Sequence, residues 1–103
     1  MPIKITVLKK LNPKDIFGKE IKNPEGKVIP TCSAFEEGQE FLVEKLNQPD
    51  KFCGWAWRDI YKDVSVLNFG GDFPWTEPNE AVTCCTDGYR PVIFKIERLP
   101  EEK

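Results

Sequence analysis

The chain has 103 residues, 40% of them hydrophobic, and this length predicts one globular domain over residues 1–103. Its 15 basic and 17 acidic residues are interspersed and give a net charge of −2, which argues against nucleic acid or an anionic membrane as the main partner. No apolar run approaches the length that spans a bilayer, and a strand pattern begins at once in place of a secretion signal. We therefore expect a cytoplasmic protein.

The first half of the chain predicts two strands, one short helix and a loop. Residues 3–7 alternate between apolar and polar side chains, as a strand with one buried face does. Residues 12–18 predict a single helical turn, because they combine an Asn cap, a Pro at the first position and a terminating Gly. Turn residues dominate 19–30 and indicate a surface loop, and residues 40–44 alternate again as a second strand.

One substantial helix is predicted at about residues 54–68. Its apolar side chains recur at helical spacing and form one stripe: Trp57, Ile60, Tyr61, Val64 and Leu67. Cys53 lies at the N-terminus of this helix, on the buried side. The free backbone N–H groups and the positive end of the helix dipole favour a thiolate or an anionic cluster at such a position.

Residues 81–97 predict a β-hairpin with a tight turn at Asp87-Gly88. Alternation places Cys84 on the core side together with Val82, and it places Cys85 on the opposite side. On the returning strand the core-facing residues are Val92, Phe94 and Ile96. The aromatic loop at residues 69–75 precedes the hairpin, and we expect it to be buried.

Together these elements predict an α+β fold. The expected architecture is a small, mainly antiparallel sheet or partly closed barrel of four to five strands, with one main helix at about residues 54–68 packed on it.

The chain contains four cysteines and no histidine. The lack of histidine excludes Ser-His and Cys-His catalysis and every mixed Cys/His metal site. A reducing cytosol disfavours structural disulfides, which leaves metal binding, thiol chemistry or simple burial as roles for the thiols. We therefore consider a catalytic role less favoured than a binding role.

No pair of these cysteines has the C-x-x-C spacing of structural zinc sites, but each lies at a loop or at the end of an element. Four thiolates can hold a tetrahedral zinc ion or an iron–sulfur cluster. A cluster accepts the neighbours Cys84 and Cys85 on different irons, whereas a zinc ion forces both onto one atom. An aromatic residue near each thiol would form a dry shell: Phe35, Phe52, Trp55 and Tyr89.

Four segments resemble a family of small prokaryotic four-cysteine proteins of about this length. They are Phe35–Phe41, Phe52–Tyr61, Phe69–Trp75 and Cys84–Glu97, and the resemblance covers nearly the whole chain. The family is best represented in anaerobes and is sometimes labelled an uncharacterised repeat protein. Some members have Pro in place of Gly54 and His in place of Arg58. The resemblance implies a shared fold unit and no established activity or cofactor.

These features lead to the hypothesis of a cysteine-rich iron–sulfur protein that binds one cluster of the 4Fe-4S kind through Cys32, Cys53, Cys84 and Cys85. Its role would be electron transfer with a redox or protein partner, or structural support. The alternatives are a zinc-stabilised interaction module, a thiol-based redox enzyme that uses Cys53 with Cys84 or Cys85, and thiols that serve packing alone. Asp59 and Asp63 are expected on a solvated helix face, and Arg90 in an exposed turn.

Overall fold

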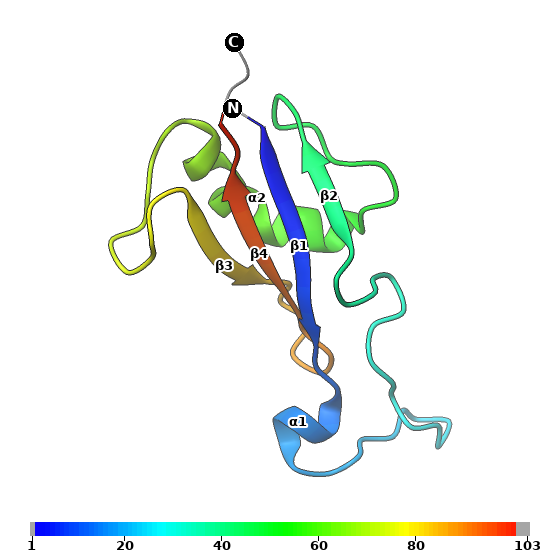
Figure 1. Cartoon of the computed structure of the whole chain (residues 1–103). Coiled ribbons are helices and arrows are strands. Elements are labelled where there is room, and N and C mark those ends of the chain that lie inside the picture. The colour runs from blue at the N-terminus through cyan, green and yellow to red at the C-terminus, as the bar shows by residue number, and fades with distance from the viewer. Residues whose placement is uncertain (1, 101–103) are drawn as a thin grey trace.

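The structure is a computed structural model, and it describes residues 2–100. In chain order its elements are β1 (Ile3–Lys10), α1 (Pro13–Phe17), β2 (Glu40–Val43), α2 (Gly54–Asn68), β3 (Glu80–Cys84) and β4 (Val92–Arg98). The strands form one antiparallel sheet in the order β2-β1-β4-β3, and α2 lies across one face of it (Figure 1). The predicted α+β class is confirmed, and the sheet is open and does not close into a barrel.

The core lies between the sheet and α2. Residues that pair directly across an antiparallel sheet share a face, and the buried pairs of the central strands follow this rule. Ile5 pairs with Ile96 on one side and with Phe41 on the other, and Val7 pairs with Phe94. These residues are buried as the alternation in the sequence predicts.

Helix α2 supplies the other half of the core through one buried stripe. Its buried residues are Ala56, Trp57, Ile60, Val64 and Leu67. Tyr61, which the sequence also assigned to this stripe, is exposed at its edge and packs its ring against Trp57 at 5.5 Å between centroids. Among the described residues, no helix is both long and apolar enough to cross a membrane.

The predicted helical turn at residues 12–18 is confirmed as α1. Asn12 caps it through a reciprocal capping box with Asp15, and Gly18 ends it in the left-handed region at φ 75°. This turn and the predicted loop at residues 19–30 extend beyond the end of the sheet (Figure 1). They make the molecule long, 55 × 29 × 20 Å, with a radius of gyration of 15.1 Å against about 13 Å for a compact chain of about 100 residues.

The predicted hairpin is confirmed as β3 and β4, but two details of the prediction were wrong. The connection is a seven-residue loop, residues 85–91, and Gly88 does not take a positive φ. The faces of β3 are also reversed, since Ala81 is buried opposite Ile96 whereas Val82 is 59% exposed. Cys84 therefore lies on the face that points away from α2, and Cys85 is the buried cysteine.

The aromatic loop at residues 69–75 was predicted to be buried, and this is wrong for two of its three aromatic side chains. Phe69 and Trp75 are 78% and 77% exposed. Phe73 is partly buried, packs against the core, and lies 5.3 Å from the Trp75 ring between centroids. Apolar side chains in a loop have no alternation that fixes which of them face the core.

Arg98 at the end of β4 holds this loop to α2. Its Nη1 donates to the carbonyl oxygens of Leu67 at 2.9 Å and Gly71 at 2.7 Å. Its Nη2 donates to Asp72 Oδ1 at 2.9 Å, and Nε and Nη2 both donate to Asn79 Oδ1. The Asn79 N–H first, and then Arg98, hold the pKa of Asp72 below its usual 3.8. One planar guanidinium thus joins three chain segments.

Replacing Arg98 by lysine is expected to destabilise the protein by about 2–4 kcal/mol, because an ammonium group cannot satisfy acceptors arranged for a planar fork. The side chain is only 8% exposed, so water cannot replace the lost bonds. Urea unfolding of the metal-free protein measures the change. The exposed Arg58→Lys is the control and should stay within about 0.5 kcal/mol of the wild type. An equal effect of the two substitutions would contradict the role of Arg98.

Candidate metal centre

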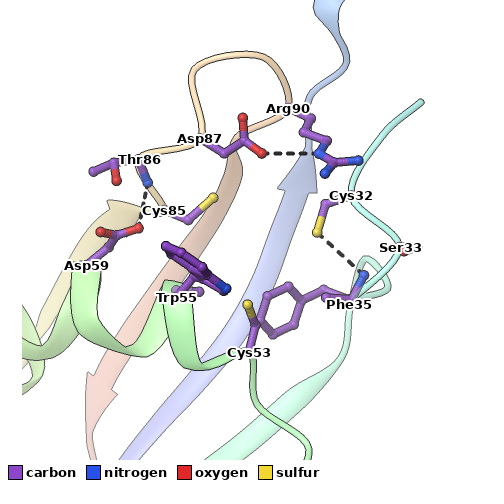
Figure 2. A pocket seen from close by; sticks show the side chains of 12 residues that line it. Cys32, Ser33, Phe35, Cys53, Trp55, Asp59, Cys85, Thr86, Asp87 and Arg90 are labelled. Carbon is purple, nitrogen blue, oxygen red and sulfur yellow. Dashed lines mark hydrogen bonds and ion pairs between the residues drawn. The ribbon is translucent and has the colours of Figure 1, made fainter. Parts of the chain in front are cut away.

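A pocket of about 500 Å³ opens where three segments of the chain meet (Figure 2). The segments are the loop before β2, the start of α2 and the connection between β3 and β4. Each contributes one cysteine to the lining: Cys32, Cys53 and Cys85, respectively. Three of the four candidate residues therefore share one pocket, although 21 and 32 positions separate them along the chain.

Cys32 is positioned by a loop that is fastened to the end of β1. Phe35 anchors the loop because its ring is buried among the rings of the core. Lys10 Nζ donates to the carbonyl oxygen of Phe35 at 2.8 Å, and the backbone of Gly38 pairs with that of Val7 at 2.7 Å. Within this loop the N–H of Ala34 donates to Cys32 Sγ at 3.4 Å (Figure 2).

Cys53 is the N-cap residue of α2. Its side chain makes no capping hydrogen bond, and the first turn, Gly54 to Trp57, carries no acidic residue. The positive end of the helix is therefore not neutralised by a side chain of its own first turn. Phe52 fixes the approach to the helix, since its ring is buried and Gln48 Nε2 donates to its carbonyl oxygen at 2.8 Å.

Cys85 lies immediately after β3 and is 9% exposed. Its backbone N–H donates to the carbonyl oxygen of Val92 at 3.1 Å, and the N–H of Val92 donates to Cys85 Sγ at 3.2 Å. The next residue is held as well, because the N–H of Thr86 donates to Asp59 Oδ2 at 2.9 Å. The sulfur thus accepts a hydrogen bond inside the protein while it faces the pocket.

Cys84 does not line this pocket and is exposed. It is the last residue of β3 and pairs with Ile93 in the sheet. Its neighbour Thr83 is directed toward α2, where its hydroxyl donates to Asp63 Oδ2 at 2.7 Å. Because adjacent strand residues point to opposite faces, Cys84 lies on the face of the edge strand β3 opposite to Thr83, and its side chain does not line the pocket.

Two carboxylates of α2 have a role that sequence reasoning missed. Asp59 and Asp63 were expected on a solvated face, but they accept the hydrogen bonds from Thr86 and Thr83 just described. They fasten the end of β3, and with it Cys85, to the helix. Their spacing of four residues places both on one helix face. This spacing indicates a contact with β3 only once the structure shows that β3 packs beside α2.

The surroundings of the pocket differ from the predicted dry aromatic shell. Phe35 is a buried wall, and Trp55 also lines the pocket but is 81% exposed. Figure 2 shows the Trp55 indole in the view between Cys53 and Cys85. Tyr89 instead packs against Phe17, 5.4 Å between ring centroids. Arg90, expected in an exposed turn, is half-buried and lines the pocket, with its Nε 3.1 Å from Asp87 Oδ2.

The three pocket thiols lie around the cavity and do not meet at one point. In the described part of the chain, residues 2–100, no three cysteine or carboxylate side chains form a group that could hold a single ion as they stand. The donor set nevertheless has the chemistry of a thiolate-binding site, because Cys32 and Cys85 each accept a backbone N–H and Cys53 lies at the N-terminus of α2. Such donors stabilise anionic sulfur.

Comparisons with known proteins found no match among protein families, curated proteins or solved structures. The resemblance to small four-cysteine proteins therefore stays a prediction from the sequence. The class of protein defined by the fold and the pocket is an α+β protein with a three-thiol cavity.

The exposed Cys84 is expected to react slowly with alkylating reagents at neutral pH. Partial burial of its sulfur, followed by the nearby Cys85, Asp59 and Asp63, raises the pKa of Cys84 above its usual 9.0. Only the thiolate reacts, so its rate of labelling should rise about tenfold per pH unit up to pH 9. Iodoacetamide labelling of the metal-free protein, mapped by mass spectrometry, measures this rate. A rate that levels off below about pH 8 would contradict it.

Proposed function

We propose that the protein is a small iron–sulfur protein whose cluster occupies the pocket and is ligated by Cys32, Cys53 and Cys85. Its role would be electron transfer with a partner protein, or structural support of the loops that surround the pocket. The observation that carries the proposal is the arrival of three thiols from three separate segments at one cavity. The sequence also predicts Cys84 as a ligand, and that assignment stays a prediction.

Hydrogen bonds to sulfur support the proposal. Cys32 and Cys85 each accept a backbone N–H, at 3.4 and 3.2 Å, and Cys53 lies at the positive end of α2. Hydrogen bonds to the ligand sulfurs are one of the means by which proteins set the potential of a cluster. Thiols that served packing alone would have no need of such donors around a solvent-accessible cavity.

The size of the pocket favours a cluster over a single zinc ion. The volume is about 500 Å³, and among residues 2–100 no three cysteine or carboxylate side chains form a group that could hold a single ion. A cluster spreads its ligands over several irons, so its thiolates stay farther apart than four ligands at about 2.3 Å from one zinc ion. When bound, the cluster would supply a one-electron couple, and the chain would supply the ligands and the hydrogen bonds to sulfur.

A thiol redox function is the second candidate, and one observation favours it. Cys53 and Cys85 line the same pocket, and Cys53 occupies a helix N-terminus, where nucleophilic thiolates are stabilised. This function requires the two sulfurs to form a disulfide while two electrons and two protons pass to an oxidised substrate, such as another disulfide. A zinc-stabilised interaction module would use the same pocket, with the exposed Phe69 and Trp75 as an apolar contact.

The test is purification without oxygen, followed by a visible absorption spectrum and assays of iron, sulfide and zinc on the same sample. We expect broad absorption near about 400 nm with iron and sulfide in equal amounts. Stoichiometric zinc without sulfide would contradict the iron–sulfur proposal and favour a zinc-stabilised interaction module. The protein could also be purified without metal and fail to take up iron and sulfide during anaerobic reconstitution. This outcome would contradict the proposal and favour thiol chemistry.

A further inference from the structure

We propose that the outer edge of β3 pairs with β3 of a second copy of the chain, so that two sheets join into one across a two-fold axis. The sheet order β2-β1-β4-β3 makes β3 an edge strand, with β4 as its single neighbour among the described strands (Figure 1). An edge strand presents free backbone groups on which another strand can pair. This inference does not depend on a bound metal.

The backbone groups of Val82 and Cys84 face the free edge of β3. Successive residues of a strand in an antiparallel sheet direct their backbone N–H and C=O groups to opposite sides. The N–H of Cys85 donates to the carbonyl oxygen of Val92 at 3.1 Å, so residue 85 bonds toward β4. By alternation residues 81 and 83 also bond toward β4, and residues 82 and 84 direct their N–H and C=O groups away from it.

The side chains of this edge do not protect it against pairing. Residues 81–86 read Ala-Val-Thr-Cys-Cys-Thr and include no charged residue and no proline. Val82 is 59% exposed and Cys84 is exposed, and both lie on the face of β3 opposite to Thr83. Proteins commonly block an edge strand with a charge, a proline or a bulge, and β3 pairs with β4 in regular register. An unprotected edge with β-branched residues favours addition of a strand.

The other edge of the sheet has the protection that β3 lacks, which makes a second β3 the favoured partner. Strand β2 is only four residues long, begins with Glu40 and is followed by Glu44. Two copies of β2 paired about Leu42 would place Glu40 opposite Glu44, and like charges directly opposite each other destabilise a strand pair. Pairing of β2 with β3 would leave a free edge at each end and build an open chain of molecules, whereas β3 with β3 closes as a dimer.

A two-fold axis at Thr83 satisfies both outward residues of β3. In this register Val82 of one copy lies opposite Cys84 of the second copy, and each such pair exchanges both of its N–H···O bonds. Glu80 lies opposite Thr86 of the second copy and keeps its ion pair with Lys95 at 3.4 Å. No like charges therefore oppose each other along the new strand pair. An interface of one short strand pair is smaller than the roughly 800 Å² per partner of a standard interface, so we expect a dimer that dissociates on dilution.

Sedimentation velocity of the metal-free chain under reducing conditions tests the proposal across an about hundredfold range of protein concentration. We expect the mass to rise from the 11.9 kDa of one chain toward twice that value. Val82→Lys places a charge on the edge and should shift association at least about tenfold to higher concentration. Leu42→Lys is the matched control on β2, where the side chain is 50% exposed, and should associate as the wild type does. A wild type that stays monomeric throughout, or equal effects of the two substitutions, would overturn the proposal.

Hydrogen exchange followed by nuclear magnetic resonance locates the interface in the wild type, without a substitution. The dimer would bond the N–H groups of Val82 and Cys84, so their exchange should slow by about tenfold or more from the lowest to the highest concentration. The N–H of Leu42 also points outward, because the bond from Val7 N–H to the Gln39 carbonyl oxygen directs the odd-numbered residues of this segment toward β1. Its exchange should not change. A dimer that protects Leu42, or that protects neither edge, would contradict pairing through β3.

Discussion

Replacing Cys85 by serine is expected to abolish cluster binding. The side chain is almost fully buried at the pocket wall, and its sulfur already accepts the Val92 N–H at 3.2 Å. A serine hydroxyl is a much weaker ligand for iron than a thiolate, because iron–sulfur clusters select soft sulfur donors. We expect iron and sulfide after anaerobic loading to fall by about tenfold or more, because at other metal sites even the loss of a hydrogen-bond partner of a ligand costs about 10–100-fold in affinity.

Cys32→Ser and Cys53→Ser should have effects of the same size, since all three thiols line the pocket. Assays of iron and sulfide on the loaded variants measure the loss, and thermal unfolding of the metal-free forms shows whether each variant folds. Cys84→Ala serves as the matched control on the neighbouring position. A folded Cys85→Ser variant with the full wild-type iron content would remove Cys85 from the ligand set.

Replacing Phe35 by alanine is expected to weaken both the fold and the proposed metal centre. Phe35 is 2% exposed and lies edge to face with Phe41, Phe52 and Phe94, at 5.9, 4.9 and 5.1 Å between ring centroids. Truncating a buried phenylalanine to alanine costs about 3–5 kcal/mol, a large part of the roughly 5–15 kcal/mol that stabilises a typical domain. We expect the unfolding temperature to fall by about 15 °C or more.

The same substitution removes the anchor of the loop that carries Cys32. Cluster affinity should therefore decrease although no ligand has been changed, and Phe35→Leu should restore part of both properties. Thermal unfolding of the metal-free protein and iron content after loading are the two measurements. The exposed Phe69→Ala is the control and should leave both near wild type. An unfolding temperature for Phe35→Ala within about 2 °C of the wild type would contradict this account of the core.

The sequence was sufficient to predict the elements whose two faces differ in polarity. Val92, Phe94 and Ile96 are buried and alternate with the less buried Ile93, Lys95 and Glu97, two of which are charged, so the core face of β4 was identified correctly. Strand β3 and the residue after it have apolar side chains on both faces: Ala81 and Cys85 on one, Val82 and Cys84 on the other. There the face is set by pairing with β4 across a seven-residue connection, which alternation within β3 does not reveal.

The convergence of the thiols depends on tertiary packing and could not be predicted from spacing. Cys32 reaches the pocket because Phe35 enters the core and Lys10 holds the loop to β1. Cys85 is held there through the bond between Thr86 and Asp59. The sequence did predict that Cys53 lies at a helix N-terminus, because residues close together in the sequence determine where a helix begins. Long-range contacts of loops have no such local pattern.

Anomalous diffraction at the iron absorption edge, on crystals of the protein loaded with iron and sulfide without oxygen, tests the central claim most directly. We expect one strong anomalous peak, elongated by several irons, inside the pocket and bounded by the sulfur atoms of Cys32, Cys53 and Cys85. A peak on the opposite face of β3 beside Cys84, or iron scattered over surface carboxylates with an empty pocket, would contradict it.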